Sequence, residues 1–116
     1  MAEKAVSAKR VGRWLQFEWL AVTENDTFAA IYVADNVTDI LLEVEGTFGS
    51  STVVLKQWVV TEAALFSAVD PGGSAISITT SSKSIPVRDA FPHMRPTHSG
   101  GTSTTLDVRI HMKTRI

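Results

Sequence analysis

Residues 104–112 alternate apolar and polar side chains more regularly than any other part of the chain. Side chains two residues apart point to the same face of an extended strand, so this alternation is typical of a strand with one buried face. We therefore predict a half-buried β-strand here. Its apolar face carries Leu106, Val108, Ile110 and Met112, and its polar face carries Asp107, Arg109, His111 and Lys113.

Shorter apolar runs separated by polar turns occupy most of the remaining chain. Further strands are predicted at residues 14–22, 28–34, 40–45, 52–60 and 75–80. In the first of them, Phe17, Trp19 and Ala21 are expected on one face. Turn signals recur about every 8–12 residues, as in antiparallel sandwiches. The sequence thus predicts an all-β fold, an antiparallel β-sandwich or jelly roll of about seven or eight short strands with at most one short helix.

Three local features refine this prediction. The corner Gly46-Thr47-Phe48-Gly49 combines two glycines, which allow a sharp turn, with an aromatic side chain that can enter the core. Pro86, Pro92 and Pro96 fall close together and predict an irregular region or a sheet edge. Residues 61–69 have helical composition, but they are short for an autonomous helix, and the alternative of a strand of small residues stays open.

The 116 residues are enough for one domain. Residues 14–116 are predicted to form the β-sandwich domain, and residues 1–13 an N-terminal arm that pairs with a neighbouring subunit. The arm is basic but lacks the apolar region of a signal peptide, so the protein is expected in the cytoplasm or in a particle assembled there. Its basic residues are Lys4, Lys9, Arg10 and Arg13.

The charge balance predicts which partners are absent. Eleven basic residues oppose twelve acidic ones, for a net charge of −1. Because nucleic acids and anionic membranes attract a concentrated basic face, neither is an expected partner. No apolar run approaches the ~20 residues of a membrane-spanning helix. The chain has no cysteine, which excludes disulfides and thiolate metal sites.

No residue spacing in the chain predicts catalysis. The histidines are His93, His98 and His111, and they lack the further ligands that a zinc site needs. Glu43 and Glu45 lie on one face of a single predicted strand, whereas the carboxyl groups of glycosidases face each other across a cleft. No nucleophile elbow accompanies the many serines. We therefore expect no enzymatic activity, no metal and no cofactor.

The aromatic residues allow one binding hypothesis. Together they could form a platform for sugars, although a domain of this size needs large side chains for its core and its interfaces. The residues concerned are Trp14, Trp19, Phe48, Trp58 and Phe66.

Several motifs occur in a characteristic order along the chain. Trp19-Leu20-x-Val22-Thr23 and Asp26-Thr27 come first, then Val44-x-Gly46-Thr47-Phe48-Gly49 with Thr52-Val53-x-Leu55, then residues 94–102 (Met-Arg-Pro-Thr-His-Ser-Gly-Gly-Thr), and finally Leu106-Asp107-Val108. This pattern resembles that of small virion proteins of tailed bacteriophages. The chain departs from it at residues 56–62, where such proteins often carry a turn similar to Ser-Asn-Asp-Gly.

The resemblance implies a β-sandwich that assembles into the virion. The expected function is that of a capsid decoration (cement) protein, a homotrimer or homodimer that braces neighbouring major capsid protein subunits on the capsid surface. A tail, neck or head-completion component is the first alternative, and a carbohydrate-binding head-fibre-like module is the second. Phe91 and Met94 are expected to be exposed beside Arg95, although Phe91 could equally pack over the end of the sandwich. The candidate interface residues are Lys4, Lys9, Arg10, Arg13, Phe91, Pro92, His93, Met94 and Arg95.

Overall fold

The computed structural model describes residues 2–33, 36–62, 65–88 and 91–115, and in these residues it contains twelve strands and no helix. The all-β prediction is confirmed. Seven strands have five residues or more, and the other five have two or three. The strands are β1 (Ala2–Lys4), β2 (Ser7–Val11), β3 (Trp14–Val22), β4 (Asp26–Phe28), β5 (Ile31–Tyr32), β6 (Val37–Thr47), β7 (Ser51–Trp58), β8 (Phe66–Ser67), β9 (Ser77–Ile78), β10 (Ser82–Pro86), β11 (His93–Gly100) and β12 (Thr105–Thr114).

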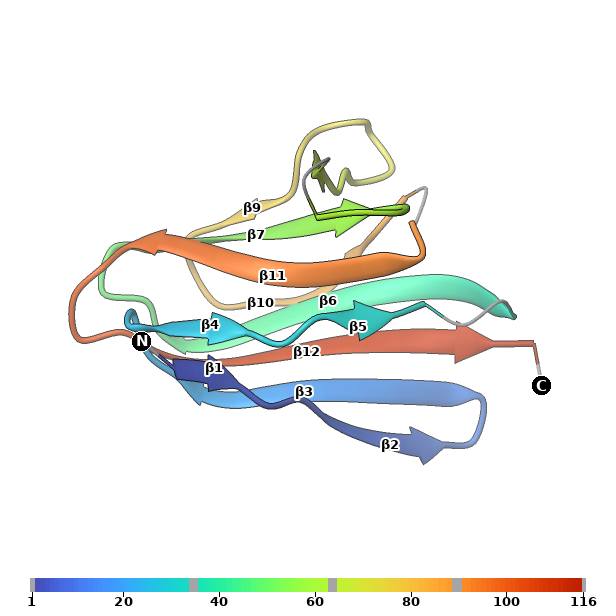
Figure 1. Cartoon of the computed structure of the whole chain (residues 1–116), viewed down its shortest axis with the longest axis horizontal. Coiled ribbons are helices and arrows are strands. Elements are labelled where there is room, and N and C mark those ends of the chain that lie inside the picture. The colour runs from blue at the N-terminus through green and yellow to red at the C-terminus, as the bar shows by residue number, and fades with distance from the viewer. Residues whose placement is uncertain (1, 34–35, 63–64, 89–90, 116) are drawn as a thin grey trace.

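The long strands form two layers, as expected for a sandwich (Figure 1). The first layer, called here the β12 sheet, has the strand order β10-β6-β12-β3-β2. The second layer, called the β7 sheet, has the order β5-β11-β7-β8, and β9 also pairs with β7. In Figure 1, β4 and β5 cross the near side of the molecule between the layers. All pairs within the two large sheets are antiparallel, whereas β1 and β4 form a separate parallel pair.

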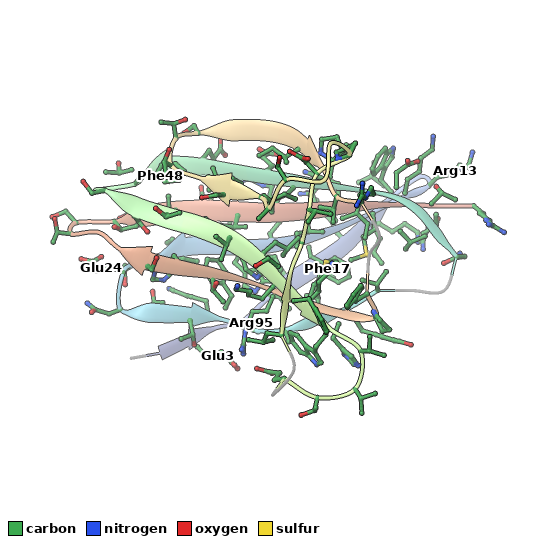
Figure 2. All side chains as sticks on the ribbon, turned by 90° about the horizontal axis from the view of Figure 1, so that it is seen from above. Glu3, Arg13, Phe17, Glu24, Phe48 and Arg95 are labelled. Carbon is green, nitrogen blue, oxygen red and sulfur yellow. The ribbon has the colours of Figure 1, made fainter. Side chains whose placement is uncertain are left out.

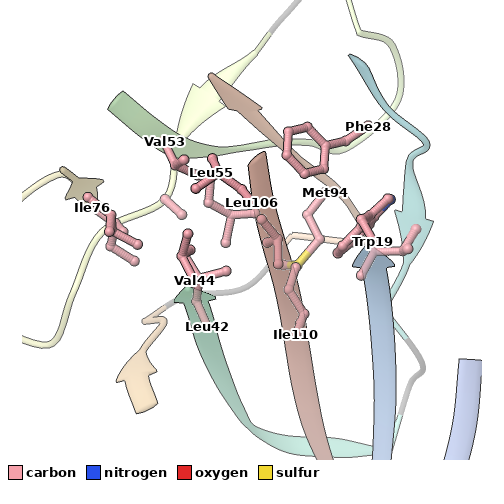
Figure 3. Close-up of a cluster of buried hydrophobic side chains, with 14 of the residues drawn as sticks. Trp19, Phe28, Leu42, Val44, Val53, Leu55, Ile76, Met94, Leu106 and Ile110 are labelled. Atoms are coloured by element: carbon pink, nitrogen blue, oxygen red, sulfur yellow. The ribbon is translucent and has the colours of Figure 1, made fainter. Parts of the chain in front are cut away.

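The core lies between the two sheets and is built from the alternating apolar residues (Figure 3). The four predicted apolar positions of β12, from Leu106 to Met112, are all buried. They face Val53 and Leu55 of β7 and Met94 of β11 in the same cluster. Full burial of one such side chain stabilises the fold by about 1.5–3 kcal/mol, so this contact between layers is the main source of stability.

A bulge in β3 changes one predicted face. Trp19 is opposite Val108 and Val22 is opposite Leu106, so β3 has one residue more than β12 over this interval. The extra residue resets the alternation. Val22 is therefore buried, and Ala21 is exposed with φ +55°. The prediction that Ala21 shares a face with Trp19 is wrong, because regular alternation cannot anticipate a bulge.

The two glycine-rich turns meet at one end of the sandwich. Phe48 is buried and belongs to the core, as predicted. Gly49 has φ +55°, and a Cβ at this position would collide with the carbonyl oxygen of Thr102. The backbone N–H of Thr102 also donates to the Gly49 carbonyl at 2.9 Å. Glycine is therefore needed at residue 49 both for its backbone conformation and for space.

The proline-rich segment is more regular than predicted. Residues 93–100 form the eight-residue strand β11, which pairs with β7 along its whole length. On its other side β11 pairs with β5 only at His93 and Met94. The prediction of irregular structure is wrong for these residues, but the alternative of a sheet edge holds from Arg95 onwards. Pro96 lies on this edge, where a missing N–H leaves no gap in the ladder to β7.

The strands on both sides of the predicted boundary at residue 13 pair with other strands of the same chain. Within the predicted arm, β1 pairs with β4 and β2 pairs with β3 of the same chain. The division at residue 13 stays a prediction. For the segment of residues 61–69, the described part contains the strand β8 and no helix, while residues 63–64 lie outside the described residues.

Candidate interaction surface

Three rings stack across the outer face of the β7 sheet. His93 of β11 is the register partner of both Tyr32 on β5 and Trp58 on β7, so all three side chains point the same way. The centroid of the His93 ring lies 5.3 Å from that of Tyr32 and 5.5 Å from that of Trp58, with interplanar angles of 23° and 10°. Tyr32 is half exposed, so the stack presents one aromatic ring to solvent.

The segment after β7 folds back over this stack. Glu62 forms an ion pair with Arg95, whose guanidinium carbon lies 5.8 Å from the centre of the Trp58 ring. Trp58 is only 5% exposed, although it does not belong to the core cluster between the sheets. Arg95 thus contributes both an ion pair and a cation–π contact that cover Trp58 from outside.

Exposed apolar side chains gather in the connection between β7 and β8. Of the seven large apolar residues that are exposed in the described chain, four lie between residues 59 and 66. They are Val59, Val60, Leu65 and Phe66, and Val60 is 86% exposed. Phe66 also contacts Phe91 edge to face, with ring centroids 5.2 Å apart. We call these five residues, together with Tyr32, Arg95 and its partner Glu62, the β7–β8 surface.

The structure brings some of the predicted interface residues to this surface and excludes one. Phe91, Pro92, His93 and Arg95 are all partly buried around it. Phe91 donates its backbone N–H to Oε1 of Gln57 at 3.0 Å, which holds it at the end of the sheet. Met94 is completely buried in the core, so the prediction that it is exposed is wrong (Figure 3). Its neighbours in β11 point outward, and alternation then directs Met94 inward.

The basic residues of the N-terminal segment lie elsewhere. Lys9, Arg10 and Arg13 are exposed on and beside β2, the edge strand of the β12 sheet. The side chain of Arg13 donates from Nε to the carbonyl oxygen of Thr114 at 3.1 Å, and Arg10 donates to the Thr114 hydroxyl at 3.2 Å. Figure 2 shows Arg13 at the end of the molecule opposite Glu24 and Phe48. Arg10 and Arg13 therefore tie the β2–β3 hairpin to the end of β12.

A half-buried charge network covers the outer face of the β12 sheet. Arg109 donates from Nε to Glu18 at 2.7 Å and from an η nitrogen to Glu45 at 2.7 Å and to Glu43 at 3.3 Å. His111 Nε2 lies 3.0 Å from the other oxygen of Glu43. The hydrogen bond from Arg109 lowers the pKa of Glu18, and the carboxylates raise that of Arg109 above its usual value. Glu43 and Glu45 share one face, as predicted, and hold a cation between strands.

A small pocket of about 180 Å³ opens between β4 and β11. It is lined by Asp26, Thr27, Phe28, Arg95, Pro96, Thr97 and His98. His98 Nε2 lies 2.7 Å from the carbonyl oxygen of Asp26, and since a carbonyl only accepts, the nitrogen donates. At this pocket, the His98 side chain of β11 therefore bridges to the backbone of β4.

The described residues hold no cluster of metal ligands, and their histidines lie apart. They contain no group of three or more histidines, cysteines and carboxylates that could hold a metal ion. His93 and His98 differ by an odd number of positions in one strand, so they point to opposite faces, and His111 lies on the other sheet. Trp19 and Trp58 are buried and Trp14 is partly buried, so the described tryptophans form no exposed row for a sugar.

Comparisons with known proteins add no family assignment. No family model matches the chain, no curated protein matches it, and no solved structure matches it. Among the described residues there is also no helix with the length and apolar character needed to cross a membrane. Sequence reasoning missed the exposed apolar residues in the connection between β7 and β8. Their one signal in the sequence is the pair of consecutive apolar residues Val59 and Val60 directly after a strand.

Proposed function

We propose that this chain is a non-catalytic structural protein of a tailed bacteriophage, a capsid decoration protein that binds the outside of the shell as a homotrimer or homodimer. The observation that carries the proposal is the β7–β8 surface. Its exposed apolar side chains are concentrated in a single connection, beside an aromatic ring and an ion-paired arginine. Aromatic residues and arginine are enriched at protein interfaces, and gathered exposed apolar groups are typical of a surface that another protein covers.

The order of motifs from Trp19 to Val108 supports the phage assignment. Two parts of that pattern are glycine-rich turns, and they contact each other in the fold. They are Gly46-Thr47-Phe48-Gly49 and Gly100-Gly101-Thr102. They therefore serve to shape a sandwich end. A rigid sandwich with a separate contact surface is suited to a role in an assembly.

A decoration protein needs only a modest contact with each shell subunit. Each copy of an oligomer that engages several subunits raises the effective concentration of the others, so weak single contacts add up to stable binding. The β7–β8 surface, which is confined to one connection and the adjacent strand ends, is consistent with such a contact. We propose that it faces the major capsid protein.

The experiment is to mix the purified protein with expanded capsid shells that lack it, then to sediment and image the mixture. Saturable binding at regular lattice positions is expected. A Val60→Asp variant is expected to bind at least tenfold more weakly, because the charge would have to be desolvated in the interface. Leu20→Asp is the matched control, since Leu20 is 48% exposed on β3, away from this surface.

Two results would overturn the proposal. One is the absence of shell binding together with association with purified tails or necks, which would favour the alternative virion position. The other is quenching of tryptophan fluorescence by glycans without shell binding, which would favour the carbohydrate-binding alternative. Equal loss of shell binding in Val60→Asp and Leu20→Asp would leave the β7–β8 surface without a specific role.

A further inference from the structure

The strand that passes along the near side of the sandwich changes partner halfway. At β5, the N–H of Val33 donates to the Pro92 carbonyl at 2.7 Å, and Ile31 is opposite Met94. In an antiparallel ladder every second residue directs its backbone groups to the same neighbour. Continuing this register places Ala29 opposite Pro96. Because proline has no N–H, Pro96 cannot donate to the carbonyl oxygen of Ala29, which accepts from Nε1 of Trp19 at 3.1 Å instead.

The N–H of Ala29 has its partner in β1, where it donates to the carbonyl oxygen of Lys4 at 3.1 Å. From there β4 pairs in parallel with β1, with Glu3 opposite Thr27 and Lys4 opposite Phe28. One edge of β4 is thus completed by the first strand of the chain, as in strand addition by a bound peptide.

β1 is joined to the rest of the fold only weakly. In the described residues it belongs to neither large sheet, and β4 is its one strand partner. Two residues connect it to β2: Ala5 is exposed, and Val6 packs against the core. Val6 therefore anchors the chain after β1, while Ala5 is the position at which β1 can change direction without disturbing the core.

We propose that β1 is exchanged between copies in the assembled oligomer, so that residues 2–4 of one copy pair with β4 of a neighbour. A second copy is the occupant that fits, because the edge of β4 already accepts these residues in the single chain. Exchange of an identical element reproduces the same contacts between subunits and is a low-cost route to oligomers. A pair or a closed ring satisfies every β4 edge.

The short connection limits the geometry of this exchange. One or two extended residues span at most about 7 Å, so the β4 strands of neighbouring copies must lie close to each other's Val6. The inference deepens the oligomer part of the proposed function, and it can be tested without any shell. Its failure is therefore distinguishable from failure of capsid binding.

The test uses disulfide capture, which is clean because the chain has no cysteine of its own. Single variants Glu3→Cys and Thr27→Cys, one of them carrying a size tag, are mixed as folded proteins at high concentration and oxidised. Both side chains are exposed, and the two residues are register partners. The control mixture combines Thr52→Cys with Ser99→Cys, partners in the β7–β11 ladder that we expect to stay within one chain.

Strand exchange predicts a disulfide between Glu3→Cys of one chain and Thr27→Cys of another, at several times the yield of the control mixture. The double variant Glu3→Cys/Thr27→Cys should in addition form covalent dimers or rings on oxidation, in a fraction that rises with protein concentration. The proposal would be overturned if the mixed single variants gave no more intermolecular disulfide than the control mixture. It would also be overturned if the double variant formed only intramolecular disulfides at every concentration.

Discussion

The hydroxyl of Thr104 donates to the backbone carbonyl of Phe48 at 2.8 Å and so joins two turns that are 56 residues apart in sequence. Thr104 is buried, and so is Phe48. The same carbonyl also accepts the N–H of Ser51 at 2.9 Å, so both of its acceptor positions are used. Together with the N–H of Thr102 on the Gly49 carbonyl, the bond from Thr104 fixes the β6–β7 turn against the β11–β12 turn. This end of the sandwich therefore depends on two glycine-rich segments at once.

Replacing Gly49 with alanine is expected to be strongly destabilising. The backbone at Gly49 has φ +55°, which costs a residue with a Cβ about 1–2 kcal/mol. The new Cβ would also meet the Thr102 carbonyl, so the two turns would have to separate. Urea unfolding measures the loss. The control is Gly12→Ala, with φ +60° but no atom within 4 Å of the added Cβ. Equal losses in both variants would show that steric contact with Thr102 is unimportant.

Removing the cation of the β12 sheet is expected to destabilise the fold at neutral pH. Arg109→Met leaves Glu18, Glu43 and Glu45 close together without their guanidinium partner. Because these groups are half-buried, we expect a loss of about 1–3 kcal/mol, between the values for exposed and buried pairs. Arg109→Lys loses the planar guanidinium fork but keeps the charge, so its loss should be smaller than that of Arg109→Met. A loss in Arg109→Met that does not shrink when the carboxylates are protonated by acid would contradict this account.

Acid is expected to destabilise the native protein through three carboxyl groups. Arg109 lowers the pKa of Glu18. The pKa of Glu24 is lowered by hydrogen bonds from its own backbone N–H and from those of Thr104 and Ser103. The pKa of Asp26 is lowered by the backbone N–H of Thr23. A carboxyl whose pKa is lower in the folded state stabilises it above the unfolded pKa, near about 4. That contribution disappears as the pH falls through the folded value. Urea unfolding at a series of pH values should therefore show stability falling below pH ~4.

The control for this pH dependence is Glu24→Gln, which removes one titrating group. Its carboxylate accepts the N–H groups of Ser103 and Thr104 at 3.0 and 3.1 Å. The variant should be less stable than the parent at neutral pH, and the difference should narrow in acid. A constant difference at all pH values would mean that the carboxylate charge of Glu24 contributes nothing to the fold.

The alternation of side chains predicted those parts of the fold that depend on one strand at a time. It located the buried face of β12, because burial on one face leaves a period of two in the sequence. The burial of Phe48 was predicted separately, from its place between two glycines at a corner. The alternation did not anticipate the bulge at Ala21, because an extra residue in one strand is defined only by its partner. Met94 was expected to be exposed because its proline-rich segment was not predicted to be a strand, and its inward direction follows from the pairing of β11 with β7.

The candidate surface was predictable only in part, for a related reason. Arg95 and His93 were identified from their place in the proline-rich segment, but their partners Glu62, Tyr32 and Trp58 come from other strands or connections. Contacts between segments distant in sequence leave no local pattern.

The opposite positions of Met94 and Phe91 give a prediction that separates folding from binding. Met94 is fully buried in the core, so Met94→Ala should lower the free energy of unfolding by about 2–5 kcal/mol. Phe91 is partly buried and contacts Phe66 at the edge of the β7–β8 surface, so Phe91→Ala should cost less stability. Urea unfolding measures both variants. Below its unfolding transition, Met94→Ala should still bind shells, because its side chain is not on the surface, whereas Phe91→Ala should bind more weakly. Weaker binding by Met94→Ala alone would show that core packing, and not the β7–β8 surface, governs the interaction.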